Sequence, residues 1–298
     1  MQCRSTLTRI DSLRTGELSE AEVHEVTHHL SSCGSCNESL SDVEEFAFAI
    51  RGLQKLRPAR SCASSVCEEV FHTFDQFDVD GQQVQLAFSS AGITRIDLGG
   101  GSRDDFASSY TKKFGSELRD GSVPIEYREA IERALRGEPT TLPPIDISRL
   151  SEFEQQVLRS IAKIPRGEAR SYEWVARVVG RPKAVRAVGN VMASNPVPLL
   201  LPCHRVVPAS GGLGGYGFGT PMKRRLLAAE DAPVDELEAL ARKNIRYVGS
   251  NVTMTFCFPT CTGVRKIRPD QKLLFRDAEE ARRHGYRPCN RCSPVLAA

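Results

Sequence analysis

The chain carries one short segment that decides how the rest is interpreted, Leu201-Pro202-Cys203-His204-Arg205-Val206-Val207. A thiol is an effective nucleophile only as the thiolate, and its free pKa is about 8.5. A neighbouring imidazole can accept the thiol proton when a carboxylate orients the ring. We therefore expect Cys203 to be a nucleophile held deprotonated, with His204 as its base. From these residues alone, a buried core cysteine beside an unrelated histidine explains the segment equally well.

Helices are expected on the N-terminal side of this segment. Ser151 and Glu154 form a capping-box pattern before a run with one apolar face. Two short helices are expected at 171–179 and 183–193, separated by Gly180-Arg181-Pro182. This tight connection is typical of a helix-turn-helix, although helical hairpins of other kinds share it. A short strand at 205–207 and a helix at 222–230 are expected to follow, with a glycine-rich loop between them.

Further upstream the pattern changes to alternation. Val84, Leu86 and Phe88 alternate with polar residues, a Ser-Ser-Ala-Gly turn follows, and a second apolar run predicts a hairpin. Helices are expected at 102–114 and 124–136. Residues 80–148 should therefore form a small α/β unit.

Five segments occur in the order found in a known family: Ile164-Pro165-Arg166-Gly167-Glu168, Ser171-Tyr172, Arg186-Ala187-Val188-Gly189-Asn190, Asn195-Pro196-Val197-Pro198 and Pro202-Cys203-His204-Arg205-Val206. On these segments, residues 80–234 resemble the O6-alkylguanine-DNA alkyltransferases, also called methylated-DNA–protein-cysteine methyltransferases. The resemblance implies a ribonuclease H-like α/β subdomain followed by a helix-turn-helix catalytic domain. Non-enzymatic relatives lack the cysteine, which this chain retains.

The resemblance also implies roles in catalysis. Cys203 would attack the alkyl carbon on guanine O6, with His204 as its base through a water molecule. Glu230 would orient His204, and Asn195 would brace the turn by hydrogen bonds. Tyr172 would donate a proton to the departing guanine. Because nothing in the sequence suggests a way to cleave the thioether, we expect a single-turnover reagent.

Other residues are expected to contact DNA. Guanine O6 is buried in a duplex, so the base must leave the stack at a cost of a few kcal/mol. Arg186 resembles the residue that fills the gap, because a guanidinium offers both charge and a planar surface. Ala187 and Gly189 keep their helix slim for approach to a groove, although tight helix packing would explain them too. Pro198 and Tyr172 complete the expected DNA contacts, and the partner is double-stranded DNA carrying alkylated guanine.

The C-terminal cysteines have metal-ligand spacing. Cys257-x3-Cys261 and Cys289-x2-Cys292 are two close pairs of the kind that hold tetrahedral Zn²⁺. Their surroundings resemble the Ada-type metal-binding domain, which implies that Cys257 accepts a methyl group from a DNA methylphosphotriester. Methylation would remove one negative charge, so we expect tighter DNA binding afterwards. A purely structural zinc site is the alternative.

A second metal site is expected near the N-terminus. His29-x3-Cys33-x2-Cys36, with Cys3 upstream, resembles the zinc-binding anti-sigma domains, which implies a Zn²⁺ held by Cys3, His29, Cys33 and Cys36 and a sigma-factor partner. His28 could replace His29, although the spacing favours His29. A chance Cys-x2-Cys pair on a helical turn is the alternative. Cys62 and Cys67 receive no role.

These patterns predict an α+β multidomain protein with a helical zinc knuckle, a small α/β unit, a helix-turn-helix alkyltransferase domain and a small four-cysteine zinc domain. The expected boundaries are 1–56 for the N-terminal zinc domain, 57–79 for a linker, 80–148 and 149–234 for the two alkyltransferase parts, 235–249 for an acidic linker and 250–298 for the C-terminal zinc domain. A second helix is expected in the first domain, from about Glu38 to Leu56.

Composition sets limits on location and partners. The net charge of +3 is weak evidence for nucleic-acid binding, but basic residues cluster at 177–186, 223–225, 265–272 and 282–291. An apolar secretion signal and a membrane-length apolar run are both lacking, so we expect a monomeric cytoplasmic protein with reduced cysteines. The alternative functions are lesion binding without chemistry, or damage-responsive regulation through the N-terminal domain and a sigma factor.

Overall fold

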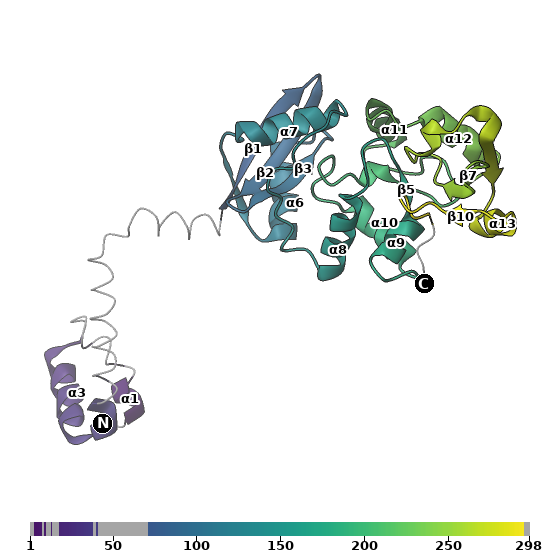
Figure 1. Ribbon diagram of the computed structural model, residues 1–298. Coiled ribbons are helices and arrows are strands. Elements are labelled where there is room, and N and C mark those ends of the chain that lie inside the picture. Colours follow the sequence, from purple (N-terminus) through teal and green to yellow (C-terminus); the bar gives the residue numbers. More distant parts are fainter. Residues whose placement is uncertain are drawn as a thin grey trace. The chain divides into compact units, whose positions relative to one another are not determined.

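The computed structural model describes residues 3–7, 9, 13, 18–37, 40 and 71–294 (Figure 1). The chain divides into two compact units, Met1–Cys67 and Glu68–Ala298. The expected helix from about Glu38 to Leu56 lies outside the described residues except for Leu40, and Cys62 and Cys67 lie outside them entirely.

The smaller unit is helical where it is described. It contains α1 (Cys3–Leu7) and α3 (Glu20–Ser32). The expected capping box is confirmed, because the backbone N–H and the hydroxyl of Ser19 both donate to the Glu22 carboxylate, at 3.1 and 2.7 Å. Val26 and Leu30 lie on one face of α3 and pack with Cys36 in a small apolar core.

The larger unit begins with a four-stranded sheet in the order β3-β2-β1-β4. Its strands are β1 (Phe71–Val79), β2 (Gln82–Ser89), β3 (Gly92–Asp97) and β4 (Glu117–Asp120). The first three strands pair antiparallel, whereas β4 pairs parallel with β1. The predicted hairpin is confirmed as β2 and β3.

Both faces of this sheet are covered. On one face, Phe106, Tyr110 and Phe114 of α6 (Arg103–Phe114) pack on the strands. The opposite face contributes to the main apolar core, together with α7 (Ile125–Leu135). The same core continues into the helices that follow in the chain, so the sheet and these helices share one buried apolar interior.

Residues 152–229 form short elements around that core. They are α8 (Glu152–Ile161), β5 (Arg170–Ser171), α9 (Tyr172–Val178), α10 (Val185–Ala193), the 3-10 turn η1 (Cys203–Arg205), β6 (Val206–Val207) and α11 (Thr220–Ala229). Ser151 caps α8 with the predicted capping box. Gly180 adopts φ +70 directly after α9, a conformation that glycine allows and that lets the chain turn towards α10. In Figure 1, α8, α9 and α10 lie between the sheet and the C-terminal elements.

The C-terminal part is a second four-stranded sheet in the order β10-β8-β7-β9. Its elements are α12 (Val234–Arg242), β7 (Tyr247–Ser250), β8 (Thr255–Cys257), η2 (Val264–Lys266), η3 (Pro269–Gln271), β9 (Lys272–Phe275), α13 (Ala278–Arg283) and β10 (Arg287–Pro288).

Both predicted linkers are wrong in part. The linker over 57–79 includes β1, whose burial changes phase at Asp75–Gln76 and so hides the simple alternation of a strand. The acidic linker over 235–249 contains most of α12 and the start of β7. Val234, Leu237 and Leu240 are buried at helical spacing, and the acidic residues between them face outwards. Among the described residues, none of the helices is long and apolar enough to cross a bilayer.

Candidate functional site

Cys203 lies at the start of a tight turn that local contacts hold in place. Its backbone N–H donates to the Leu201 carbonyl at 2.8 Å, and Leu199 adopts a positive φ of 72 just before it. Asn195 ties this turn together, because its Nδ2 donates to the Leu201 carbonyl at 2.8 Å and its Oδ1 accepts from the Val197 N–H at 3.1 Å. The structure thus places Asn195 where a brace of the Cys203 turn would have to be.

His204 and Glu230 form a buried pair beside Cys203. The Nε2 of His204 donates to Oε1 of Glu230 at 2.8 Å, and the two residues are 1% and 4% exposed. Arg205 also binds this carboxylate through Nε and Nη2, at 2.9 and 2.8 Å. The other ring nitrogen, Nδ1 of His204, is buried and has no hydrogen-bond partner among the described residues. It is therefore the nitrogen that is free to take a proton.

The electrostatics of the pair favour a neutral base beside an ionised carboxylate. Burial raises the pKa of Glu230, but its bonds to His204 and Arg205 outweigh burial and bring the pKa down to about 2. Burial lowers the pKa of His204 despite the opposing effect of Glu230. At neutral pH the imidazole is therefore uncharged and can accept a proton.

The resting state of Cys203 differs from the expected thiolate. Burial raises the pKa of the Cys203 thiol, although Asn195, the Lys223 charge and Tyr216 act in the opposite direction. A thiol that is 4% exposed loses the solvation that stabilises its anion. Cys203 is thus a thiol at rest.

Cys203 nevertheless borders open space. It lines a cavity of about 330 Å³ together with Tyr172 from the start of α9, Gly189 and Met192 from α10, and Tyr216 from the glycine-rich loop. A Cβ built on Gly189 would meet nothing within 4 Å, so this position adds room to the cavity. The cavity has the volume of a small-molecule pocket.

A second cavity of about 370 Å³ borders Cys203 on the side of the N-terminal sheet. It is lined by Asn195 and Pro198, by Phe218 of the glycine-rich loop, and by Arg95 and Lys113 from β3 and α6. Cys203 is therefore accessible from two directions.

Three of the expected DNA-contacting residues line the two cavities, Tyr172 and Gly189 the first and Pro198 the second. Arg186 is exposed on α10, one turn before Asn190, and Ala187 and Gly189 are partly exposed on the same helix. Tyr172 is partly buried, and burial together with the nearby Cys203 raises the pKa of its phenol. Pro198 is buried and borders the second cavity.

Sequence reasoning missed three residues around Cys203. Arg205 shares the Glu230 carboxylate, as described above. Lys223 is fully buried, its Nζ donates to the carbonyls of Val206 and Gly215 at 2.6 and 3.3 Å, and burial lowers its pKa to about 8. The Tyr216 hydroxyl is buried at the cavity, where its hydrogen bonding to the Cys203 thiol opposes the rise in thiol pKa that burial causes. Two aromatic residues, Tyr216 and Phe218, stand among the glycines at 211–219, and they are the signal that could identify Tyr216.

The four C-terminal cysteines come together as predicted. One sulfur from each of Cys257, Cys261, Cys289 and Cys292 lies within 4.8 Å of the others, and all four thiols are free. Gly263 approaches closely, since a Cβ there would lie 3.5 Å from the Cys261 sulfur, and its N–H stabilises the Cys261 thiolate. A close set of four thiolates with a backbone donor fits a tetrahedral zinc ion.

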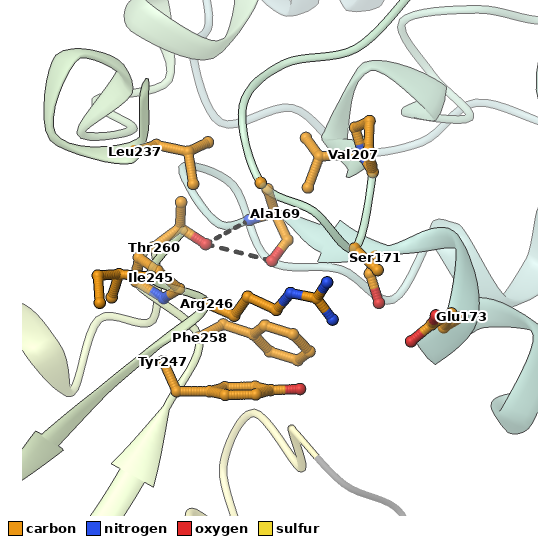
Figure 2. Close-up of a pocket in the computed structure, with 14 residues that line it drawn as sticks. Ala169, Ser171, Glu173, Val207, Leu237, Ile245, Arg246, Tyr247, Phe258 and Thr260 are labelled. Atoms are coloured by element: carbon orange, nitrogen blue, oxygen red, sulfur yellow. Dashed lines mark hydrogen bonds between the residues drawn. The ribbon is translucent and has the colours of Figure 1, made fainter. Parts of the chain in front are cut away.

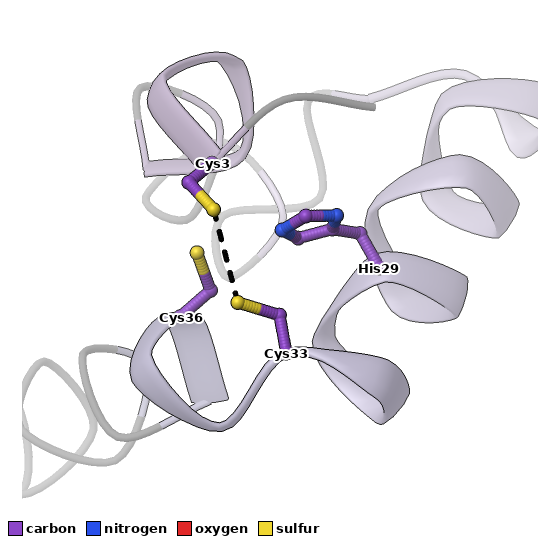
Figure 3. Close-up of side chains that lie close together, drawn as sticks. All are labelled: Cys3, His29, Cys33 and Cys36. Carbon is purple, nitrogen blue, oxygen red and sulfur yellow. Dashed lines mark hydrogen bonds between the residues drawn. The ribbon is translucent and has the colours of Figure 1, made fainter.

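The predicted N-terminal ligands also converge. Cys3 of α1, His29 of α3, Cys33 and Cys36 place their ligand atoms within 4.8 Å of one another, and His29 points towards the three sulfurs (Figure 3). Nε2 of His29 is buried without a hydrogen-bond partner among the described residues. His28 is exposed and lies outside the cluster. Three sulfurs and an unpartnered imidazole nitrogen are a donor set that fits zinc.

Comparison with known families identifies two segments of the chain. Residues 152–232 match the family described as 6-O-methylguanine DNA methyltransferase, DNA binding domain, and residues 240–295 match the metal binding domain of Ada. The chain thus combines a domain of the 6-O-methylguanine DNA methyltransferase family with a domain of the Ada metal-binding family.

Individual relatives agree with this assignment. The chain is 46% identical over 95 residues to the bifunctional transcriptional activator/DNA repair enzyme Ada of Escherichia coli, which covers 32% of this chain and 26% of that protein. It is 50% identical over 82 residues to the methylated-DNA–protein-cysteine methyltransferase of Mycolicibacterium paratuberculosis, which covers 28% of this chain and 50% of that protein. The chain thus spans a quarter to a half of these relatives. The crystal structure of Mycobacterium tuberculosis O6-methylguanine methyltransferase aligns with 55% of this chain and 97% of its own, at 30% identity and a TM-score of 0.46.

Proposed function

We propose that the protein repairs DNA by transferring a methyl or larger alkyl group from guanine O6 to Cys203, and that each molecule acts once. The observation that carries this proposal is the cavity whose wall contains Cys203, backed by the buried His204–Glu230 pair. The match of residues 152–232 to the 6-O-methylguanine DNA methyltransferase family supports the same chemistry. The matches give no support to regulation through a sigma factor.

The residues around the cavity have distinct tasks in this reaction. The Cys203 proton passes to Nδ1 of His204, directly or through a water molecule, and Glu230 stabilises the imidazolium that forms. The sulfur then bonds to the alkyl carbon while the bond from that carbon to guanine O6 breaks. The electron pair stays on guanine, which takes a proton from Tyr172, and His204 returns its proton to the phenolate. The products are guanine and a thioether on Cys203.

The target base has to reach Cys203 from outside the duplex. We infer that α9 and α10 act as a helix-turn-helix and that Arg186 fills the place of the extruded base, because Arg186 is exposed on the helix that lines the cavity. The sheet order β3-β2-β1-β4 with one parallel pair is consistent with a ribonuclease H-like N-terminal subdomain.

A duplex carrying one O6-methylguanine tests this proposal. Digestion to nucleosides after incubation measures the loss of O6-methylguanine and the gain of guanine. We expect the wild-type protein to convert the lesion and Cys203→Ser to leave it unchanged. Conversion by Cys203→Ser at the wild-type rate would refute the assignment of the nucleophile.

We also propose that the C-terminal site holds Zn²⁺ and that Cys257 accepts methyl groups from methylphosphotriesters. The match of residues 240–295 to the Ada metal-binding domain supports this activity, with a structural zinc site as its rival. Bound zinc would keep the Cys257 sulfur as an electron-rich thiolate.

Phosphate contacts would come from the basic residues near this site. Arg268 and Lys272 already pair with acidic side chains. Arg265 and Arg291 contact the loop at 167–168. Of this group, Lys266 and Arg287 therefore have no ion pair in the described part of the chain. An oligonucleotide with one methylphosphotriester should add a methyl group to the Cys257 peptide and should bind more tightly afterwards. Absence of the adduct would favour a structural site.

For the N-terminal cluster we propose a second Zn²⁺, supported by the convergence of Cys3, His29, Cys33 and Cys36. Elemental analysis of the purified chain should give two zinc ions per molecule. A sigma-factor partner is an implication of the sequence resemblance alone, and a pull-down with purified sigma factors would test it.

A further inference from the structure

The loop at 166–171 lies between the zinc-binding region and the Cys203 turn. On the zinc side, Thr260 comes directly before the ligand Cys261, and its hydroxyl bonds to both backbone groups of Ala169 (Figure 2). It accepts from the Ala169 N–H at 2.8 Å and donates to the Ala169 carbonyl at 3.2 Å. Thr260 is 1% exposed, so these bonds are shielded from water.

A buried ion pair strengthens the same contact. Glu168 and Arg170 are 0% and 2% exposed and pair with each other. The Glu168 carboxylate also accepts from the Thr262 N–H at 3.0 Å, and the Arg170 guanidinium lies 5.3 Å from the centre of the Phe258 ring. Thr262 and Phe258 belong to the segment that carries Cys257 and Cys261. The loop is therefore joined to the zinc-binding region by buried polar groups.

On its other side this loop reaches the catalytic carboxylate. The N–H of Gly167 donates to Oε2 of Glu230 at 3.2 Å, and the Gly167 carbonyl accepts from Nη2 of Arg265 at 2.9 Å. Gly167 has φ +73, and a Cβ there would lie 2.5 Å from the Glu230 carbonyl oxygen and 2.9 Å from Nη2 of Arg265. Three residues later β5 begins, in which Arg170 pairs with Val206 of β6, next to the Cys203 turn.

We propose that Arg265 of the zinc-binding region is a positioning residue for the reaction at Cys203. By holding the Gly167 carbonyl, it fixes the one backbone N–H that donates to Glu230, and Glu230 in turn orients His204. The zinc-binding region is thus part of the alkyltransferase site as well as a proposed acceptor in its own right. This inference rests on the proposed reaction at Cys203.

The charges in this arrangement explain why one more donor is needed. Oε1 of Glu230 is shared between His204 and Arg205, whereas Oε2 depends on Arg205 and Gly167. Gly167 is the residue with the greatest backbone freedom in this arrangement, because glycine has no side chain to restrict it. Without Arg265, the Gly167 carbonyl would lose its side-chain donor. The orientation of the Gly167 N–H towards Oε2 of Glu230 would then no longer be fixed. Residues that orient a reacting side chain through such contacts typically contribute about 10- to 100-fold to activity.

Three variants of the full-length, zinc-loaded protein test the proposal. Arg265→Met removes the donor, Arg265→Lys retains one donor for the single bond to Gly167, and Arg268→Met is the matched control. Arg268 lies three residues away and is exposed, and its side chain contacts the nearby Asp270 and Gln271. For each protein we would measure the single-turnover transfer rate at saturating O6-methylguanine duplex, the affinity for that duplex on a Cys203→Ser background, and the zinc content.

A second readout does not depend on the DNA reaction. The folded protein is treated with iodoacetamide between about pH 6 and pH 10, and the alkylation of Cys203 is measured on its tryptic peptide. The pH dependence of this rate reports the apparent pKa of the Cys203 thiol. Because a misplaced Glu230 supports the His204 imidazolium less well, we expect Arg265→Met to shift this profile to higher pH. Arg268→Met should leave it in place.

The expected result is a loss of about tenfold or more in transfer rate for Arg265→Met, with recovery in Arg265→Lys. Affinity, zinc content and the Arg268→Met control should match the wild type. A transfer rate and a pH profile within twofold of the wild type would overturn the proposal, and so would a loss that follows zinc content or affinity. If the wild type itself transfers no methyl group, the proposed reaction at Cys203 is refuted. The iodoacetamide profiles then still decide whether Arg265 positions Glu230.

Discussion

Replacement of Glu230 by glutamine removes the charge on which the His204 pair depends while keeping the size of the side chain. In the wild type the carboxylate binds Nε2 of His204, Nε and Nη2 of Arg205, and the Gly167 N–H. A neutral amide cannot stabilise an imidazolium in a buried site. It also offers one acceptor oxygen in place of two, so it leaves some of these donors without a partner.

The magnitude follows from the pKa of Glu230. Its interactions lower this pKa from 4.5 to about 2, and each unit corresponds to about 1.4 kcal/mol, which gives about 3 kcal/mol in favour of the folded state. Since the folded-state pKa is the lower one, this stability is fully present above about pH 4.5 and is lost as the pH falls towards 2. We expect Glu230→Gln to lower the free energy of unfolding at pH 7 by about 3 kcal/mol. The transfer rate should fall by about 100-fold or more.

Urea unfolding at pH 7 and at pH 3, together with single-turnover methyl transfer at pH 7, measures both effects. The matched control is Glu129→Gln, an exposed carboxylate on α7, which should change neither quantity. The difference in stability between wild type and Glu230→Gln should shrink at the lower pH. A transfer rate within threefold of the wild type would refute the assignment of Glu230 to the orientation of His204.

Three further predictions concern the cavity, the base and the metals. Gly189→Leu should fold with at least wild-type stability, because a side chain at this position enters open space, but it should lose methyl transfer because the leucine fills the cavity. A urea titration measures the stability, and the nucleoside assay measures the transfer. Unchanged transfer would mean that the target base binds elsewhere. The lowered pKa of His204 means that the unfolded chain binds a proton below about pH 6.5 that the folded chain does not, so stability should fall as the pH drops through 6. Thermal melts from pH 7 to pH 5 should show a smaller decline for His204→Gln, and an equal decline would assign the effect to other groups. Cys33→Ser should reduce the zinc content from two ions to one without changing transfer at Cys203; elemental analysis checks the first point, and a content that stays at two would exclude Cys33 as a ligand.

Motifs with local physical causes could be predicted from the sequence. The capping boxes at Ser19 and Ser151, the hairpin of β2 and β3 and the pairing of α9 with α10 depend on residues a few positions apart. The close cysteine pairs at both ends can be predicted from their spacing, because short loops limit where two ligands can go, whereas the ligands Cys3 and His29 follow from the family resemblance.

Other features are hidden by irregularities in the local pattern. β1 pairs with β2 directly across Asp80-Gly81, but its alternation of buried residues is interrupted at Asp75–Gln76, and a linker is therefore predicted there. The acidic residues of α12 obscured three apolar positions at helical spacing. Acidic composition was given more weight there than periodicity, and periodicity was the correct signal.

Within the site, the residues named from the motif lie together, whereas their protonation could not be foreseen. Cys203 was expected as a thiolate, but its burial raises its pKa, and only the structure reveals how deeply it lies. Lys223 carries no motif of its own, and the motif that contains Gly167 and Glu168 does not reveal what these two residues contact. Their contacts with Gly215, Glu230 and Thr262 arise from tertiary packing.

The most direct measurement counts alkyl groups per protein. The protein is incubated with a tenfold molar excess of duplex containing O6-methylguanine, and the number of lesions repaired is compared with the mass gained by each tryptic peptide. The account predicts that repair stops at one lesion per molecule and that a single methyl group resides on the peptide containing Cys203. Repair of the whole excess, with that peptide unmodified, would contradict it.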